Sequence, residues 1–183
     1  MRTTTKLDAL YESNDIRSCG NRGPIHKYDG LNATSTSRSN NQRDANFIYY
    51  RYPDILLIKA EALAETGNLE AANYLVREIA ERAGQSHITE LTYDGFITAL
   101  MNERAREFAV EGKRWFDLLR WAKKDNFANK KIIMDIILSS ATNAQVRAIL
   151  KSKVTDTMSY YLPIHEDDIL YNKQLEQNPY YDR

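Results

Sequence analysis

The chain has 183 residues, enough for one domain with a buried core, and its 25 Lys and Arg residues equal its 25 Asp and Glu residues in number. The zero formal net charge argues against a nucleic-acid-binding surface, which needs a clustered basic excess. The single cysteine, Cys19, excludes an intrachain disulfide framework and a cysteine zinc site, and no apolar run approaches the length of a membrane span.

The first part of the chain is predicted to be irregular. Residues 29–46 are mainly Ser, Thr, Asn, Arg and Asp, a composition typical of loops. A loop of this length is uncommon within a compact domain, and it is either functional or a surface excursion. We therefore expect a loop-rich segment over residues 1–46 and one helical domain over residues 47–183.

A helical hairpin is predicted directly after this segment. Pro53 suits the first turn of a helix, Gly67 suits a left-handed stop, and Asn68 suits the cap of the next helix. Apolar residues recur at helical spacing at Leu56, Ala60 and Leu63, and then at Leu69, Ala72, Val76, Ile79 and Ala83. Small residues at Ala60 and Ala72 match the close-packing positions of a tetratricopeptide repeat.

Further helices are predicted downstream. A second helical pair is expected over residues 93–124 with its turn at Gly112, and weaker helical patterns cover residues 130–153. The tail from Ser159 is aromatic and rich in turn residues. The expected fold class is all-α, with tetratricopeptide-like helical hairpins, long irregular loops and a turn-rich C-terminal tail.

The most densely charged stretch lies around Gly112. Glu103, Glu107 and Glu111 are four residues apart, so in a helix they would share one face and could hold a metal ion or serve as acid and base. Neighbouring Arg and Lys residues, and the lack of a histidine in this stretch, favour ion pairing instead. We predict a structural ion-pair network that links the two helices around Gly112 and contains Glu103, Arg104, Glu107, Arg114 and Asp117.

No catalytic or metal site is predicted elsewhere. Residues 165–168 read HEDD, which resembles a metal cluster only by composition, because neither zinc nor calcium spacing is present. A solvated turn or a helix start is the favoured interpretation. No Ser-His-Asp or Cys-His arrangement and no glycine-rich phosphate loop can be placed, so we predict no catalytic residue, no metal and no cofactor.

Several motifs in one order resemble the C-terminal half of the SusD/RagB family. The first block is RYPDILL at residues 51–57, with AEA at 60–62 and RAG at 82–84. The second block is NER at 102–104, EFA at 107–109, EG at 111–112 and RWFDL at 114–118. The tail adds LPI at 162–164 and QNP at 177–179.

The resemblance implies a non-enzymatic nutrient-uptake protein on the bacterial outer surface. Members of this family are lipoproteins that bind an oligosaccharide or polysaccharide and work with a TonB-dependent outer-membrane transporter of the SusC type. We therefore expect carbohydrate binding, polysaccharide utilisation and outer-membrane localisation. This chain would be mainly the helical scaffold of a longer protein, attached to the membrane only through a lipid anchor upstream of its sequence.

The resemblance also suggests where ligand contacts would lie. Sugar faces stack on aromatic rings and sugar hydroxyls need polar partners, and the loop-rich segment supplies both. The candidate ligand-binding residues are Tyr11, Tyr28, Asn32 and Arg38. Two other functions stay open: a tetratricopeptide-type adaptor that binds protein partners, and an enzyme that uses the face of Glu103, Glu107 and Glu111.

Overall fold

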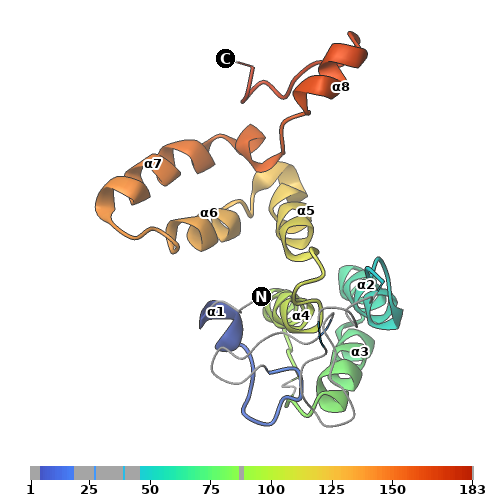
Figure 1. The fold of residues 1–183 in the computed structure, drawn as a ribbon. Helices are drawn as coiled ribbons and strands as arrows, with labels where there is room; N and C mark the ends of the chain where they lie inside the picture. Colours follow the sequence, from blue (N-terminus) through green and yellow to red (C-terminus); the bar gives the residue numbers. More distant parts are fainter. Residues whose placement is uncertain (1–4, 19–26, 28–38, 40–45, 87–88, 183) are drawn as a thin grey trace. The chain divides into compact units, whose positions relative to one another are not determined.

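A computed structural model describes residues 5–18, 27, 39, 46–86 and 89–182 of the chain. These residues form helices and turns, with no strand among them, so the predicted all-α class is confirmed. The chain divides into two compact units, Met1–Arg114 and Trp115–Arg183, which are described in turn (Figure 1). The expected domain boundary at residue 46 stays a prediction. None of the helices in the described ranges has the length and apolar character needed to cross a membrane.

Three helices build the first unit. Helices α2 (Tyr52–Glu65) and α3 (Leu69–Arg82) form the predicted hairpin, and α4 (Tyr93–Glu107) packs against both of them (Figure 1). A short helix, α1 (Thr5–Asp8), precedes them. The tetratricopeptide-like arrangement of a hairpin followed by a third packed helix is therefore present.

The hairpin core follows the predicted apolar stripes. Ala60 of α2 and Ala72 of α3 are both completely buried, which lets the two helix backbones approach closely. Gly67 makes the turn with a φ of +84°, a conformation that costs glycine little. Asn68 then caps α3 by accepting a hydrogen bond from the backbone N–H of Ala71 at 3.1 Å.

The start of α2 explains part of the first motif. Pro53 lies in the first turn, where its missing N–H is not needed. Asp54, only 1% exposed, accepts a hydrogen bond from the backbone N–H of Arg51 at 3.3 Å. This contact holds the buried carboxylate of Asp54 against the backbone of Arg51 at the helix N-terminus.

The N-terminal segment is fastened to the end of α3. The backbone N–H of Ile16 donates to the carbonyl of Ala83 at 2.9 Å, and the side-chain amide of Asn14 donates to the carbonyl of Gly84. Gly84 has a φ of +81°, and a Cβ added there would lie 2.7 Å from the backbone oxygen of Asn14. Gly84 therefore adopts the left-handed conformation that follows α3 and leaves room for the backbone of Asn14.

The second unit follows the first from α5 (Arg114–Phe127) onward. Its elements are α5, which begins at the last residue of the first unit, α6 (Lys131–Leu138), α7 (Ala144–Thr155), the 3₁₀ turn η2 (Thr157–Tyr160) and α8 (Glu166–Tyr171). Helical geometry in α5 is interrupted at Lys124, after which Asp125 and Asn126 are left-handed. The predicted helical stretches are thus present, although Ile149 within the weaker pattern of residues 130–153 is 57% exposed.

A buried tyrosine organises the second unit. The hydroxyl of Tyr160 donates to the carbonyl of Val154 at 2.8 Å, and the indole N–H of Trp115 donates to the carbonyl of Tyr160 at 3.2 Å.

In the tail, the side chain of Gln177 accepts a hydrogen bond from the N–H of Ile164 and donates one to the carbonyl of Ile164, each at 2.9 Å. The LPI and QNP motifs therefore meet through the side chain of Gln177.

The hairpin packing predicts a difference between two neighbouring alanines. Ala72→Leu should lower the free energy of unfolding by about 1–3 kcal/mol, because the added atoms overpack a completely buried helix contact. Ala71→Leu, at a half-buried position of the same helix, should cost less. Urea unfolding of the two variants checks this, and equal midpoints would contradict the assigned helix face.

Two of the left-handed glycines of the first unit, Gly67 and Gly84, make a second matched pair. Gly67→Ala should cost about 1–2 kcal/mol of stability, because only the backbone conformation is unfavourable and no atom lies within 4 Å of the new Cβ. Gly84→Ala should cost more, because its Cβ also collides with the backbone of Asn14. Thermal unfolding of both variants measures the difference; equal losses would mean that the Asn14 contact is not formed.

Candidate functional site

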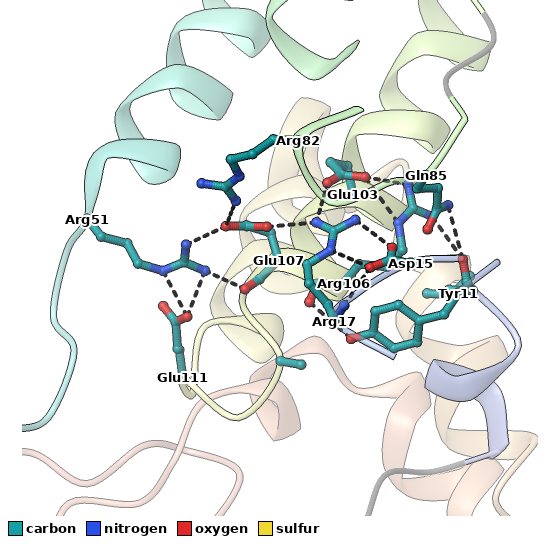
Figure 2. A network of polar contacts seen from close by, with 12 residues as sticks. Tyr11, Asp15, Arg17, Arg51, Arg82, Gln85, Glu103, Arg106, Glu107 and Glu111 are labelled. Atoms are coloured by element: carbon teal, nitrogen blue, oxygen red, sulfur yellow. Dashed lines mark hydrogen bonds and ion pairs between the residues drawn. The ribbon is translucent and has the colours of Figure 1, made fainter. Parts of the chain in front are cut away.

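A cluster of buried charges joins the N-terminal segment, α2, the end of α3 and α4 (Figure 2). We call it the ion-pair cluster. Its acidic members are Asp15, Asp54, Glu103, Glu107 and Glu111, and its basic members are Arg17, Lys27, Arg51, Arg82, Arg104, Arg106 and Lys113. All five carboxylates belong to buried residues. Burying a charge is costly unless it is paired, so the arginines and lysines are required for the packing.

Glu107 is the centre of the cluster. One of its oxygens pairs with Arg51 and with Arg82, the latter at 2.7 Å, and its other oxygen pairs with Arg17 at 2.7 Å. Arg51 also donates to the backbone carbonyl of Glu107. Three arginines from three segments of the chain thus converge on one side chain of α4 (Figure 2).

Glu103 lies one turn earlier on the same helix. It accepts hydrogen bonds from Arg17 at 2.6 Å and from the Nε of Arg106 at 3.1 Å. The Nε of Arg17 donates to the carboxylate of Asp15 at 3.0 Å, and the Nη2 of Arg17 donates to the same carboxylate at 2.8 Å. A planar guanidinium suits such forked pairing, and Arg17 therefore bridges Asp15 to both glutamates.

Glu111 lies beyond the end of α4, although its spacing predicted that it would share the helix face. The chain turns after Glu107 through Val110, with a φ of 62°, and Gly112, with a φ of 72°. Left-handed geometry is unfavourable for a β-branched residue such as valine. Glu111 reaches the cluster all the same, since Arg51 contacts it at 2.8 Å and Lys27 contacts it at 2.8 Å.

Asp54 and Phe108 form a further part of the ion-pair cluster. Asp54 pairs with Lys113, and Arg104 lies 3.8 Å from its carboxylate. The ring of Phe108 has the charged groups of Arg51, Arg104 and Lys113 between 4.7 and 4.9 Å from its centre. Cations are attracted to the face of an aromatic ring, so this buried phenylalanine belongs to the electrostatic arrangement.

The pKa shifts agree with this geometry. Burial opposes ionisation of Glu107, but hydrogen bonds from Arg51, Arg82 and Arg17 outweigh it and lower the pKa of Glu107 to about 2. The pKa of Glu111 is also lowered, since its contacts with Arg51 and Lys27 outweigh its burial. Carboxylates that stay ionised beside several cations are poor proton donors, so this arrangement suits a structural role.

The five residues of the predicted network have different partners in the structure. Glu103 and Glu107 lie in the cluster, and Arg104 contributes to it through Asp54. Arg114 donates to the backbone carbonyl of Met101 at 2.8 Å, while Asp117 belongs to the second unit and lies 3.6 Å from Arg120. The role of these five residues as one network therefore stays a prediction.

Sequence reasoning missed the main partners of the glutamates. Arg17, Lys27, Arg51 and Arg82 all lie outside the charged stretch of residues 102–121. Two of them stand in the family-like motifs, Arg51 in the RYPDILL block and Arg82 in the RAG motif. That pattern was the available signal, because helical spacing cannot reveal partners in distant segments.

Of the four predicted ligand-binding residues, the structure describes Tyr11. The hydroxyl of Tyr11 donates to the backbone carbonyl of Arg106 at 3.0 Å, so this half-buried side chain contacts α4. Tyr28, Asn32 and Arg38 lie outside the described residues.

The HEDD stretch at residues 165–168 begins a helix, which is one of the two interpretations favoured from the sequence. His165 caps α8 by accepting a hydrogen bond from the N–H of Asp167 at 3.2 Å. No group of three or more potential metal ligands occurs in the described part of the chain.

Comparison with known proteins identifies relatives along most of the chain. Residues 9–181 match the model of the SusD family. The SusD-like protein P38 of Formosa agariphila is 35% identical over 89 residues, 44% of this chain and 18% of that protein. The SusD-like protein P2 of the same organism is 39% identical over 107 residues, 52% of this chain and 20% of that protein. The chain thus matches about a fifth of the length of these curated relatives.

Two solved structures are also similar. A SusD superfamily protein from Bacteroides thetaiotaomicron is 26% identical, with a TM-score of 0.51 over 74% of this chain and 26% of its own. The surface glycan-binding protein A from Bacteroides uniformis is 20% identical, with a TM-score of 0.61 over 97% of this chain and 40% of its own. The second likeness establishes the fold alone.

The lowered pKa of Glu107 predicts a pH dependence of stability. The pKa is about 2 in the folded chain and 4.5 in an ordinary glutamate, so the stabilisation is complete above about pH 4.5 and is lost as the pH falls through about 2. Glu107→Gln should therefore be much less stable than the wild type at neutral pH, and this difference should narrow in acid.

Urea unfolding of both proteins between about pH 6 and pH 2 measures that difference. The matched control is Glu78→Gln, at an exposed position of α3, which should follow the wild type at every pH. A stability difference for Glu107→Gln that is the same throughout this pH range would contradict the ion pairing.

Proposed function

This chain belongs to the SusD family, and from that premise we propose that it is part of a glycan-binding protein of bacterial nutrient uptake. Its ligand would be an oligosaccharide or polysaccharide, and its partner a TonB-dependent outer-membrane transporter of the SusC type. The chain would act at the cell surface as the helical scaffold of that protein, without catalysing a reaction.

The arrangement of the ion-pair cluster supports the scaffold role. The family-like motifs contribute Arg51, Glu103 and Glu107 to contacts between segments far apart in the sequence. Glu107 is ionised far below neutral pH and engaged by three arginines. A side chain in this state suits neither proton transfer nor metal binding, so the motifs serve the assembly of the fold.

Family membership and the fold of a relative support the glycan role. The protein from Bacteroides uniformis that shares this fold is a surface glycan-binding protein. Surface exposure and membrane anchoring are proposed for this chain by the same family relationship, as is the partnership with the transporter.

A protein-contact role is the second candidate, and one surface favours it. Six apolar residues just before and within α2 are 48–77% exposed: Phe47, Tyr49, Tyr50, Tyr52, Ile55 and Ile58. Large exposed apolar side chains gathered in one short segment are typical of a protein interface. It would suit either a tetratricopeptide-type adaptor or the transporter contact of a glycan-binding protein.

Affinity electrophoresis tests the glycan role. The chain, and the longest natural polypeptide that contains it, are run in native gels containing soluble starch, xylan, laminarin or mannan. We expect at least one polysaccharide to retard the longer polypeptide, and the release of reducing ends to stay at background. Unretarded migration of both proteins in every gel would contradict glycan binding to these probes, and release of reducing sugar would contradict the non-enzymatic assignment.

A variant separates scaffold from site. Arg82→Ala removes one partner of Glu107 at a half-exposed position and should lower the melting temperature while leaving retardation unchanged below that temperature. Loss of retardation in a folded Arg82→Ala protein would place ligand binding in the ion-pair cluster and overturn the scaffold assignment.

A further inference from the structure

A groove with a volume of about 830 Å³ lies between α2 and α3, away from the residues of the ion-pair cluster. Its volume falls in the range of small-ligand sites in proteins. Leu63 of α2 and Ala71 of α3 give the groove an apolar part, and both side chains are only half-buried. The groove therefore offers apolar surface that solvent can reach.

Tyr74 is the aromatic residue of this groove. Its side chain is 57% exposed, and the guanidinium of Arg77 lies 5.4 Å from the centre of its ring. The two residues are one turn apart on α3, so the helix fixes their spacing. The guanidinium lies over the ring, so its N–H donors are held next to the exposed aromatic surface.

Polar groups surround this aromatic surface. Lys59 of α2 and Glu70 of α3 line the groove with opposite charges, and both are exposed. The side chain of Asn73 accepts a hydrogen bond from the N–H of Glu90 at 3.0 Å and donates to its carbonyl at 2.9 Å. This paired contact fixes the segment that brings Thr89 to the edge of the groove.

We propose that this groove is a sugar-binding subsite in which Tyr74 stacks against the apolar face of one sugar ring. Arg77, Glu70 and Lys59 would exchange hydrogen bonds with the hydroxyl groups around that ring. Lys59 and Glu70 bring opposite charges to the groove, and the charge of Arg77 is paired with Glu81 at 3.9 Å. The groove therefore offers both donors and acceptors, which suit the hydroxyl groups of a neutral sugar. The inference rests on the proposed glycan-binding function and assigns one of its contacts to this chain.

The test compares single tyrosine variants of the 183-residue chain in gels containing the same four polysaccharides. Tyr74→Ala should weaken retention by roughly threefold to tenfold, the equivalent of one lost aromatic contact, whereas Tyr74→Phe should keep it. The matched control is Tyr171→Ala, which removes an 86% exposed tyrosine from α8. Because both tyrosines are exposed, circular dichroism should give all variants the melting temperature of the wild type.

The outcomes separate this inference from the proposed function. Weaker retention of Tyr74→Ala, with unchanged retention of Tyr74→Phe and Tyr171→Ala, supports the subsite. Equal retention of Tyr74→Ala and the wild type overturns the subsite and leaves glycan binding in place. A wild-type chain that no polysaccharide retains overturns the subsite in this chain, and the longer polypeptide then decides whether glycan binding also fails.

Discussion

The first unit depends on the neutralisation of buried glutamates on α4. Glu103 and Glu107 face the interior, where an unpaired carboxylate would be prohibitively costly. Their partners come from the N-terminal segment, from the start of α2 and from the end of α3. The charges therefore favour this arrangement, because moving one of these segments away would leave a buried carboxylate without one of its arginines.

Local patterns predicted the helices well, because each helix is specified by residues close together in sequence. Gly67 and Asn68 mark the hairpin turn as expected, and Ala60 and Ala72 occupy its close contact. The ion partners were not predictable in the same way. Arg17 meets Glu103 across 86 positions, and helical periodicity contains no information about such a pair.

The same limit applies to the two candidate binding surfaces. The sequence pointed to the loop-rich segment because its composition combines aromatic and polar residues. The groove beside Tyr74 is lined by residues of the two helices of the hairpin, with Lys59 on α2 and Arg77 on α3. A concave surface of this kind exists only after the helices pack, so the residues that line it have no shared pattern in the sequence.

The distribution of tryptophan has a consequence for spectroscopy. The chain has two tryptophans, Trp115 and Trp121, and both lie in the second unit. The indole of Trp115 is also hydrogen-bonded to the carbonyl of the buried Tyr160. Intrinsic tryptophan fluorescence therefore reports directly on the folding of residues 115–183, whereas far-ultraviolet circular dichroism follows the helices of both units. If these two signals change at different temperatures, the units unfold separately; if they coincide, the chain unfolds as one cooperative structure.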